Sequence, residues 1–391
     1  MESWKRKLRM GMVGGGQGAF IGGVHRMAAA LDQNIELVAG AFSRDYENTK
    51  ETGRQLYLDP ARCYKSYEEM AQGEADLPEG ERIDFVSVVT PNKSHFPIAK
   101  TFLDHGFHVI CDKPMTYSLE EAAELVKLVE SSGLVFGLTH NYTGNPMIRE
   151  ARRMFLSGEM GTVRKVIVEY VQDFLMYPHE KEGMKQAVWR VDPAQSGLGG
   201  SLGDVGSHAS NLLEYVTGDR IETLCADMST FLPDRELDED VNVLVRLAGG
   251  GKGVIALSQI ATGEENGLRL KIYGSKGAIV WEQENPNYLA VYRYGEPRQI
   301  WTRNGAYNSP ETSAICRVPS GHPEGYLEAF ANIYVGFAEA VRRHIDGSPV
   351  AEQEYAFPTV HDGLRGMQFI QAAYDSNAKG SEWRPLTVET S

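Results

Sequence analysis

Residues 14–25 read Gly-Gly-Gly-Gln-Gly-Ala-Phe-Ile-Gly-Gly-Val-His, and this stretch decides the fold. It follows an apolar run from Leu8 to Val13 and leads into a stretch with helical periodicity that reaches Leu31. Between a strand and a helix, glycines let the backbone turn sharply and approach a pyrophosphate at the helix N-terminus. The sequence therefore predicts a dinucleotide-binding turn formed by Gly14, Gly16, Gln17, Gly18, Ala19, Phe20 and Ile21. A merely flexible glycine loop is the alternative, because Gly22 and Gly23 come later than the G-x-G-x-x-G spacing expects.

Two kinds of secondary-structure pattern divide the chain. Up to about residue 145, short branched apolar runs alternate with amphipathic stretches, which predicts parallel strands joined by crossover helices. From about Val163, longer strand-like segments are joined by glycine-rich turns, which predicts hairpins. We expect an α/β Rossmann domain over residues 1–145 and an α+β domain with a large, mostly antiparallel open sheet over 146–391. Two late helices, near residues 326–345 and 361–374, are candidates to pack back on the first domain.

Composition excludes several classes of partner. The 391 residues hold 39 Lys and Arg against 53 Asp and Glu, a net charge of -14. Such a chain has no basic surface for nucleic acid or for an anionic membrane. The four cysteines are far apart and form no Cys-x-x-Cys pair, so neither a disulfide framework nor a metal site is expected. A small-molecule function in the reducing cytoplasm fits these features best.

The segment after the second predicted strand bears on the choice of nicotinamide cofactor. An acid there accepts a hydrogen bond from the ribose of NAD, whereas an arginine accommodates the 2′-phosphate of NADP. This chain has Ser43 and Arg44 ahead of Asp45. The order favours NADP slightly, and NAD stays open because Arg44 could equally cap a turn or stack on adenine.

A second glycine-rich segment carries ionisable residues. Residues 199–208 read Gly-Gly-Ser-Leu-Gly-Asp-Val-Gly-Ser-His, and on a helix Asp204 and His208 would share one face. A histidine titrates near neutral pH, as a general base for a hydroxyl proton must. The pair is a candidate proton-handling site, and a surface pair with a structural role only is the alternative. A zinc site is disfavoured because no second histidine or cysteine lies at ligand spacing.

Four motifs in this order resemble those of one oxidoreductase family. They are the glycine-rich turn, the loop Thr90-Pro91-Asn92-Lys93-Ser94-His95, the loop Asp112-Lys113-Pro114, and the segment ending in Asp204 and His208. The chain resembles the family of glucose-fructose oxidoreductase and inositol dehydrogenase over nearly its full length. The resemblance implies that Lys113, Asp204 and His208 form the catalytic group. It also implies that the cofactor is held by the first turn, by Ser43 and Arg44, and by Thr90, Pro91, Asn92, His95, Asp112, Lys113 and Asn141.

The sequence departs from the family pattern at three places. The first loop is about three residues longer, with Gly18-Ala19-Phe20 as the extra segment. Asp112 replaces the usual glutamate. Asn211 stands where many relatives have aspartate, and Tyr142 stands where an arginine is common. Substrate preferences of better-known members are therefore not carried over.

Aromatic and bidentate side chains suit the faces and hydroxyls of a pyranose ring, although aromatics are more often part of a core. The candidates for substrate binding are Tyr142, Trp189, Arg190, Asp204, His208, His322 and Tyr326.

Three functions are compatible with these residues. The first is an NAD(P)-dependent oxidoreductase that transfers a hydride between a secondary hydroxyl of a cyclic polyol, sugar or glycoside and nicotinamide. The second is an NAD-dependent glycosidase that oxidises its sugar transiently so that the glycosidic bond can be eliminated. The third is a non-catalytic nicotinamide-sensing protein, which would have no need of a proton-handling pair. An open sheet needs a cover, so a homo-oligomer is expected, and the family resemblance implies a homodimer or homotetramer.

Overall fold

The computed structural model describes residues 6–386 and divides into two compact units. Of the described residues, unit 1 comprises 6–139 and 330–364, and unit 2 comprises 140–329 and 365–386. The division falls within helices α11 (Tyr326–Ile345) and α12 (Val360–Ala378). Each unit contains one β-sheet.

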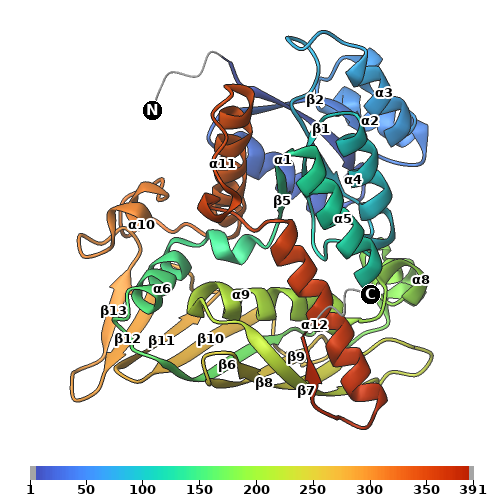
Figure 1. Ribbon diagram of the computed structural model, residues 1–391. Helices are drawn as coiled ribbons and strands as arrows, with labels where there is room; N and C mark the ends of the chain where they lie inside the picture. Colours follow the sequence, from blue (N-terminus) through green and yellow to red (C-terminus); the bar gives the residue numbers. More distant parts are fainter. Residues whose placement is uncertain (1–5, 387–391) are drawn as a thin grey trace. The chain divides into compact units, whose positions relative to one another are not determined.

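Unit 1 is built around a five-stranded parallel sheet in the order β2-β1-β3-β4-β5 (Figure 1). Its strands are β1 (Leu8–Gly14), β2 (Ile35–Ala41), β3 (Phe85–Val89), β4 (His108–Cys111) and β5 (Phe136–Leu138). Every residue of β3, β4 and β5 is buried, as expected where helices cover both faces of a parallel sheet. The predicted α/β domain with a parallel sheet is confirmed.

Three α-helices of unit 1 begin at residues whose side chains cap them. Asp45, Ser66 and Ser118 accept hydrogen bonds from the N–H groups of Glu47, Glu69 and Glu121 at three helix starts. The helices are α1 (Phe20–Leu31), α2 (Tyr46–Gln55), α3 (Tyr67–Ala75), α4 (His95–Asp104), α5 (Leu119–Ser132), the part of α11 from Phe330 onward, and the short turns η1 (Pro60–Arg62), η2 (Asn92–Ser94) and η6 (Glu352–Glu354).

Unit 2 is built around a nine-stranded sheet in the order β13-β12-β11-β10-β6-β9-β8-β7-β14. All neighbouring strands are antiparallel except β6 and β9. The predicted large, mostly antiparallel sheet is therefore confirmed. The strands are β6 (Val163–Val171), β7 (Ile221–Ser229), β8 (Asp240–Leu247), β9 (Lys252–Ser258), β10 (Gly267–Gly274), β11 (Gly277–Glu282), β12 (Tyr288–Arg293), β13 (Gln299–Thr302) and β14 (Arg384–Pro385).

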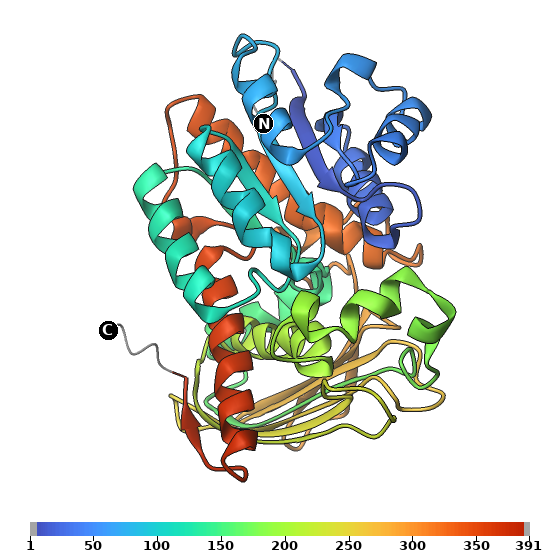
Figure 2. The same cartoon turned by 90° about the vertical axis from the view of Figure 1, so that its right-hand side faces the viewer.

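Helices cover one face of this sheet and leave the other open. Helices α6 and α9 pack against each other and against the sheet, and α12 and β14 (red) lie at its β7 end (Figures 1 and 2). Along β8, buried residues alternate with exposed ones, as expected for a sheet with one face in the core. The helices and turns are η3 (Asn141–Gly144), α6 (Pro146–Leu156), η4 (His179–Glu182), α7 (Lys185–Arg190), α8 (Pro193–Ser196), the π-helical turn η5 (Leu202–Gly206), α9 (Ser207–Thr217) and α10 (Pro310–Ala314).

Within residues 6–386, none of the helices combines the length and the apolar character that crossing a membrane requires.

Candidate active site

The glycine-rich turn leaves β1 at the point where the strand order of the unit 1 sheet reverses. Strand β1 lies between β2 and β3, and in such sheets ligands bind outside the carboxyl ends of the strands at this reversal. Gly14 and Gly15 have φ values of +86° and +72°, a conformation that side chains with a Cβ rarely adopt. A Cβ on Gly14 would lie 2.5 Å from the carbonyl oxygen of Val89. The turn thus requires glycine for steric reasons.

Gly22 contacts Gly15 across the turn. A Cβ on Gly22 would lie 2.3 Å from Cα of Gly15, so helix α1 packs directly on the backbone of the turn. In dinucleotide-binding turns the third glycine serves this close packing of helix and strand. Gly22 takes that place although it is displaced along the sequence, because the longer loop delays the start of α1 to Phe20.

The N-terminus of α1 presents backbone N–H groups that can bind an anion. Ala19 is its N-cap and provides no side-chain cap, and the first turn contains no acidic residue. The first N–H groups of a helix have no partner within the helix, so they are suited to a phosphate. Phe20, which the sequence assigned to the extra segment of the loop, is the first residue of α1 and is 63% exposed.

In the segment after β2, the acidic side chain of Asp45 has a structural role. Asp45 accepts a hydrogen bond from the N–H of Glu47 at 3.1 Å and caps helix α2, and Ser43 accepts one from the N–H of Asp45. The Arg44 side chain is exposed. The arginine, rather than the acid, is therefore the less engaged side chain at this position.

His95 ties the two loops that follow β3 and β4. One ring nitrogen lies 2.7 Å from the carbonyl oxygen of Thr90 and the other lies 2.8 Å from that of Pro114. The hydroxyl of Thr90 is buried and makes no hydrogen bond within the part of the chain that the structure describes. Asn92, also in the first loop, is buried. A buried hydroxyl at this sheet edge fits a polar ligand such as a dinucleotide.

Asp112 organises the loop that carries Lys113. Its Oδ1 accepts hydrogen bonds from the backbone N–H of Lys113 at 2.9 Å and from the hydroxyl of Thr139 at 2.8 Å. Nε2 of His25, on α1, lies 3.9 Å from the same oxygen. The shorter aspartate in place of glutamate is thus used to fix the backbone at Lys113.

In unit 2, Asp204 and His208 lie on one continuous helical segment. Asp204 is in the π-helical turn η5 and His208 is the second residue of α9. The His208 ring lies 4.8 Å from the ring of Tyr142 and 5.4 Å from that of His140. π-helical turns within α-helices are frequent at functional sites. The π-helical turn at Asp204 replaces the regular α-helical spacing that was expected to place Asp204 and His208 on one face.

A chain of polar side chains runs from Tyr142, beside His208, back to Asp204. The hydroxyl groups of Tyr142 and Tyr170 are 2.7 Å apart, and that of Tyr170 donates to Oδ1 of Asn266 at 2.9 Å. The amide of Gln172 donates to the same oxygen of Asn266, and the amide of Gln259 donates to Oε1 of Gln172.

This chain ends on the Asp204 carboxylate. Oδ2 of Asp204 accepts hydrogen bonds from Nε of Arg190 at 2.9 Å and from the Gln259 amide at 3.0 Å. Burial, with a further contribution from the negative charge of Asp204, raises the pKa of Tyr142. Burial, with contributions from Tyr142 and Asp204, raises the pKa of Tyr170 well above its usual value. Both phenols therefore keep their protons at neutral pH and can act as donors.

The glycines ahead of Asp204 are held by an acid from elsewhere in the chain. Oδ1 of Asp238 accepts from the N–H of Gly200 at 2.8 Å, and Oδ2 accepts from the N–H of Leu202 at 2.7 Å. A Cβ on Gly200 would lie 2.3 Å from the carbonyl oxygen of Asp238. Burial raises the pKa of Asp238 to about 6, although these hydrogen bonds act in the opposite direction.

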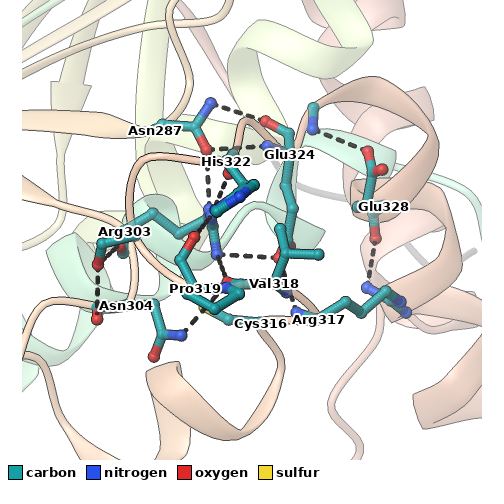
Figure 3. Close-up of polar contacts among 12 residues, drawn as sticks. Asn287, Arg303, Asn304, Cys316, Arg317, Val318, Pro319, His322, Glu324 and Glu328 are labelled. Atoms are coloured by element: carbon teal, nitrogen blue, oxygen red, sulfur yellow. Dashed lines mark hydrogen bonds and ion pairs between the residues drawn. The ribbon is translucent and has the colours of Figure 1, made fainter.

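The remaining candidates for substrate binding differ in their surroundings. Arg190 pairs with Asp204 and stacks on its neighbour Trp189 at 4.4 Å. The Tyr326 ring lies 6.4 Å from that of Tyr142. His322 is exposed, and the contact it makes in Figure 3 is through its backbone carbonyl. Asn141 precedes Tyr142 in turn η3 and is buried.

Sequence reasoning missed several residues of this site. Tyr170, Gln172, Gln259, Asn266, Asp238 and His140 come from strands and loops whose pairing no local pattern specifies. For His140 a signal was present, since it directly precedes Asn141, which the family resemblance assigns to the cofactor site. Within residues 6–386, no group of three or more His, Cys, Asp or Glu side chains is arranged to hold a metal ion.

Comparison with known proteins identifies the class of protein. Residues 8–140 match the oxidoreductase family with an NAD-binding Rossmann fold, and residues 148–280 match the GFO/IDH/MocA C-terminal domain. The uncharacterized oxidoreductase YfiI of Bacillus subtilis (strain 168) is 34% identical over 381 residues, which are 97% of this chain and 96% of that protein. Fold, site and family matches together define an NAD-binding oxidoreductase. The chain belongs to the GFO/IDH/MocA oxidoreductase family.

Two solved structures resemble the chain over nearly all of its length. An oxidoreductase from Sinorhizobium meliloti is 44% identical, with a TM-score of 0.86 over 97% of this chain and 100% of that one. An inositol dehydrogenase homolog from Azotobacter vinelandii, solved in complex with NADH and myo-inositol, is 35% identical, with a TM-score of 0.91 over 97% of this chain and 98% of that one.

Proposed function

We propose that the protein oxidises a secondary hydroxyl of a cyclic polyol, sugar or glycoside and passes the hydride to a nicotinamide dinucleotide. The observation that carries the proposal is the placement of His208 beside the two hydroxyl-bearing rings of Tyr142 and Tyr170, in a segment that also presents Asp204. The similar inositol dehydrogenase homolog that was solved with NADH and myo-inositol supports a cyclic polyol as substrate.

His208 is the proposed general base. Removing a hydride from a secondary alcohol requires that the hydroxyl proton leave, and an imidazole is suited to accept it near neutral pH. His208 is 7% exposed and is packed among the rings of His140, Tyr142 and Tyr170. These contacts fix the orientation of the ring, as a positioned base requires.

Lys113 is the proposed stabiliser of the developing alkoxide. An ammonium group beside the reacting oxygen lowers the energy of the negative charge that builds up there. The backbone of Lys113 is fixed by its hydrogen bond to Asp112.

Asp204 is proposed to bind a neighbouring substrate hydroxyl. Its carboxylate is oriented by the hydrogen bonds from Arg190 and Gln259, so accepting a further hydrogen bond from substrate would cost little reorganisation. Trp189, His322 and Tyr326 stay candidates for the walls of the substrate site.

The cofactor would lie on the glycine-rich turn, with its pyrophosphate at the start of α1 and its nicotinamide near Thr90 and Lys113. When bound, it supplies the hydride acceptor. The uncapped start of α1 and the buried hydroxyl of Thr90 fit such a ligand. The family match favours NAD, and the exposed Arg44 makes NADP a specific alternative because it could pair with a 2′-phosphate.

The open face of the large sheet supports self-association. Leu244, Tyr273 and Ile300 are exposed apolar residues on strands β8, β10 and β13. We propose a homodimer or homotetramer that uses the sheet, and expect light scattering to give a multiple of the chain mass that Leu244→Glu reduces. A monomeric mass at micromolar concentration would contradict this assembly.

The test follows nicotinamide absorbance over time with NAD and with NADP, against inositols, free sugars and aryl glycosides. The proposal expects turnover with one substrate group, and a loss of at least about a hundredfold in kcat for Lys113→Ala and for His208→Ala. Lys127→Ala and His361→Ala, which change an exposed residue on α5 and a partly exposed residue on α12, are the matched controls. A less than tenfold loss in the double variant Lys113→Ala, His208→Ala would refute these roles. Release of the aryl group that needs only trace cofactor would point to the glycosidase. No change in nicotinamide absorbance and no aryl release would point to a binding protein.

A further inference from the structure

A buried ion pair lies under the start of helix α11. Arg303 and Glu324 each have side chains that are only 2% exposed, and Nη1 of Arg303 donates to Oε1 of Glu324 at 2.9 Å. Removing two charges from water is costly unless further hydrogen bonds compensate them. Hydrogen bonds compensate the Arg303 guanidinium and Oε1 of Glu324 (Figure 3), whereas Oε2 of Glu324 is buried and has no hydrogen-bond partner within residues 6–386.

The guanidinium group of Arg303 binds backbone as well as Glu324. It donates to the carbonyl oxygens of Val318, Pro319 and His322, and its Nε donates to Oδ1 of Asn287 at 2.8 Å. Arg303 directly follows strand β13, so a rigid fork of donors at the sheet's edge holds the segment from residue 318 to 322.

Glu324 binds the same segment from its other end. Its Oε1 also accepts from the backbone N–H groups of Arg317 at 2.7 Å and Val318 at 2.8 Å. The carbonyl oxygen of Glu324 accepts from the amide of Asn287, and its N–H donates to Oδ1 of that residue. Asn287 lies between β11 and β12. The segment 317–324 is thus fastened to two strand ends of the sheet.

The fastened segment leads directly into α11. The side chain of Glu328 accepts from the N–H of Gly325 at 2.8 Å, which is half of a capping box and fixes where the helix starts. Tyr326 is the first residue of the helix. The position of Tyr326 therefore follows from the position of Glu324, two residues before it.

The start of α11 packs on the turn that carries Tyr142. A Cβ on Gly144 would lie 2.1 Å from the carbonyl oxygen of Ala329, so the two backbones are in direct contact. The rings of Tyr326 and Tyr142 are 6.4 Å apart, and Tyr142 in turn lies against His208. A shift of residues 324–329 would therefore displace Tyr142, whose ring contacts His208.

We propose that the Arg303–Glu324 pair is a positioning device that sets Tyr326 against Tyr142 and thereby determines which cyclic polyol or sugar the site accepts. Arg303 and Glu324 are positioning residues, since they act through Tyr326. The selectivity part of this inference rests on the proposed function. Weakening the Arg303–Glu324 pair should therefore change substrate selectivity. It should leave cofactor binding unchanged, because cofactor binding depends on unit 1.

The kinetic test uses Arg303→Lys, which keeps the charge but loses the fork of donors. With the best substrate of the panel, KM is expected to rise by at least about tenfold and kcat to change by less than about threefold. The ratio of kcat/KM between two cyclic substrates should also change, and the NADH dissociation constant should stay within about twofold. The matched control is Arg293→Lys. Arg293 lies on strand β12 and forms a more exposed ion pair with Glu159. Unchanged KM and unchanged selectivity in folded Arg303→Lys would overturn the proposal.

A second readout is independent of turnover. Hydrogen exchange of wild type and Arg303→Lys is compared over residues 141–144 and 326–330, and the proposal expects faster exchange in both segments. Unchanged exchange in the first segment overturns the positioning even if the enzyme is active. If wild type turns over no polyol or sugar, the proposed function fails while this exchange experiment still decides the positioning. If Arg303→Lys fails to fold, Asn287→Ala is tested in its place, because it leaves the Arg303–Glu324 ion pair intact. It is expected to show smaller changes in KM, selectivity and hydrogen exchange in the same directions.

Discussion

Nε of Arg190 donates a hydrogen bond to Oδ2 of Asp204 over 2.9 Å. The guanidinium group belongs to the short helix α7, and Asp204 belongs to the π-helical turn 14 residues later. Charge-assisted hydrogen bonds of this kind hold a carboxylate in one orientation. An arginine that was expected to contact substrate is thus engaged with a carboxylate of the proposed catalytic group.

The first prediction concerns this pair. Arg190→Met keeps much of the side-chain length but removes the donors, so Asp204 should lose its orientation. We expect kcat/KM to fall by about ten- to a hundredfold in steady-state assays, because misplacing a catalytic group costs that much. Arg54→Met, at an exposed ion pair with Glu51, is the control and should behave as wild type. Wild-type kcat/KM in Arg190→Met would show that the pair has no role in catalysis.

The second prediction separates two adjacent glycines of α1. Gly22→Ala places a Cβ 2.3 Å from Cα of Gly15, so the turn must open and NAD(H) binding should weaken by at least about tenfold. At Gly23 the nearest atom to an added Cβ, on Arg26, is 4.0 Å away. Gly23→Ala should therefore bind normally and gain about 0.5–1 kcal/mol of stability from its higher helix propensity. Fluorescence titration with NADH and thermal melting measure both effects, and equal behaviour of the two variants would contradict the packing argument.

The fold was predictable from the sequence because its determinants are local. The buried runs of β1 and β3 and the glycines between β1 and α1 are each contiguous, and their order alone specifies a parallel sheet. The placement of Gly22 was not foreseen, since the spacing rule assumes a loop of fixed length. Its role depends on a contact with Gly15 that only the packed helix creates.

The site was predictable only in part. Asp204 and His208 lie four positions apart in one motif, so the sequence could assign them to one segment, although the π-helical turn at Asp204 replaces the α-helical spacing that was expected to bring them to one face. Gln259 reaches Asp204 from beyond the end of β9, 55 residues later, and that contact depends on how β9 pairs with β6 and β8. Asp238 likewise meets Gly200 through a loop that carries no recognisable motif. Contacts made by strand pairing cannot be derived from single-sequence patterns.

The third prediction concerns a buried hydroxyl behind the loop of Asp112. The hydroxyl of Tyr334 lies 2.8 Å from Nδ1 of His25 and 2.9 Å from the hydroxyl of Ser87. Tyr334→Phe keeps the packing of the ring but removes a partner from two buried groups. We expect a loss of about 1–3 kcal/mol in the free energy of unfolding, measured by chemical denaturation. Tyr57→Phe, at a fully exposed ring, is expected to change it by less than about 0.5 kcal/mol. Equal stabilities of the two variants would refute the role of this hydroxyl.

The fourth prediction concerns Asp238, whose carboxylate holds the segment that leads to Asp204. Burial raises the pKa of Asp238 from 3.8 to about 6. The folded state therefore binds a proton more readily than the unfolded chain between these two values. The contribution of Asp238 to stability is consequently largest at low pH, and it falls as pH rises through the window up to about 6.

Asp238→Asn removes this titration. We expect the difference in free energy of unfolding, wild type minus variant, to fall by about 1 kcal/mol between pH 5 and pH 7.5 in urea denaturation. The variant should also lose a constant amount at every pH, because an amide has one acceptor oxygen whereas the N–H groups of Gly200 and Leu202 bind both oxygens of the carboxylate. Asp240→Asn, at the more exposed aspartate that begins β8, is the control and should show no such slope. A difference that stays flat, or that rises with pH, would mean that Asp238 is ionised in the folded protein throughout this range because its two backbone hydrogen bonds outweigh its burial.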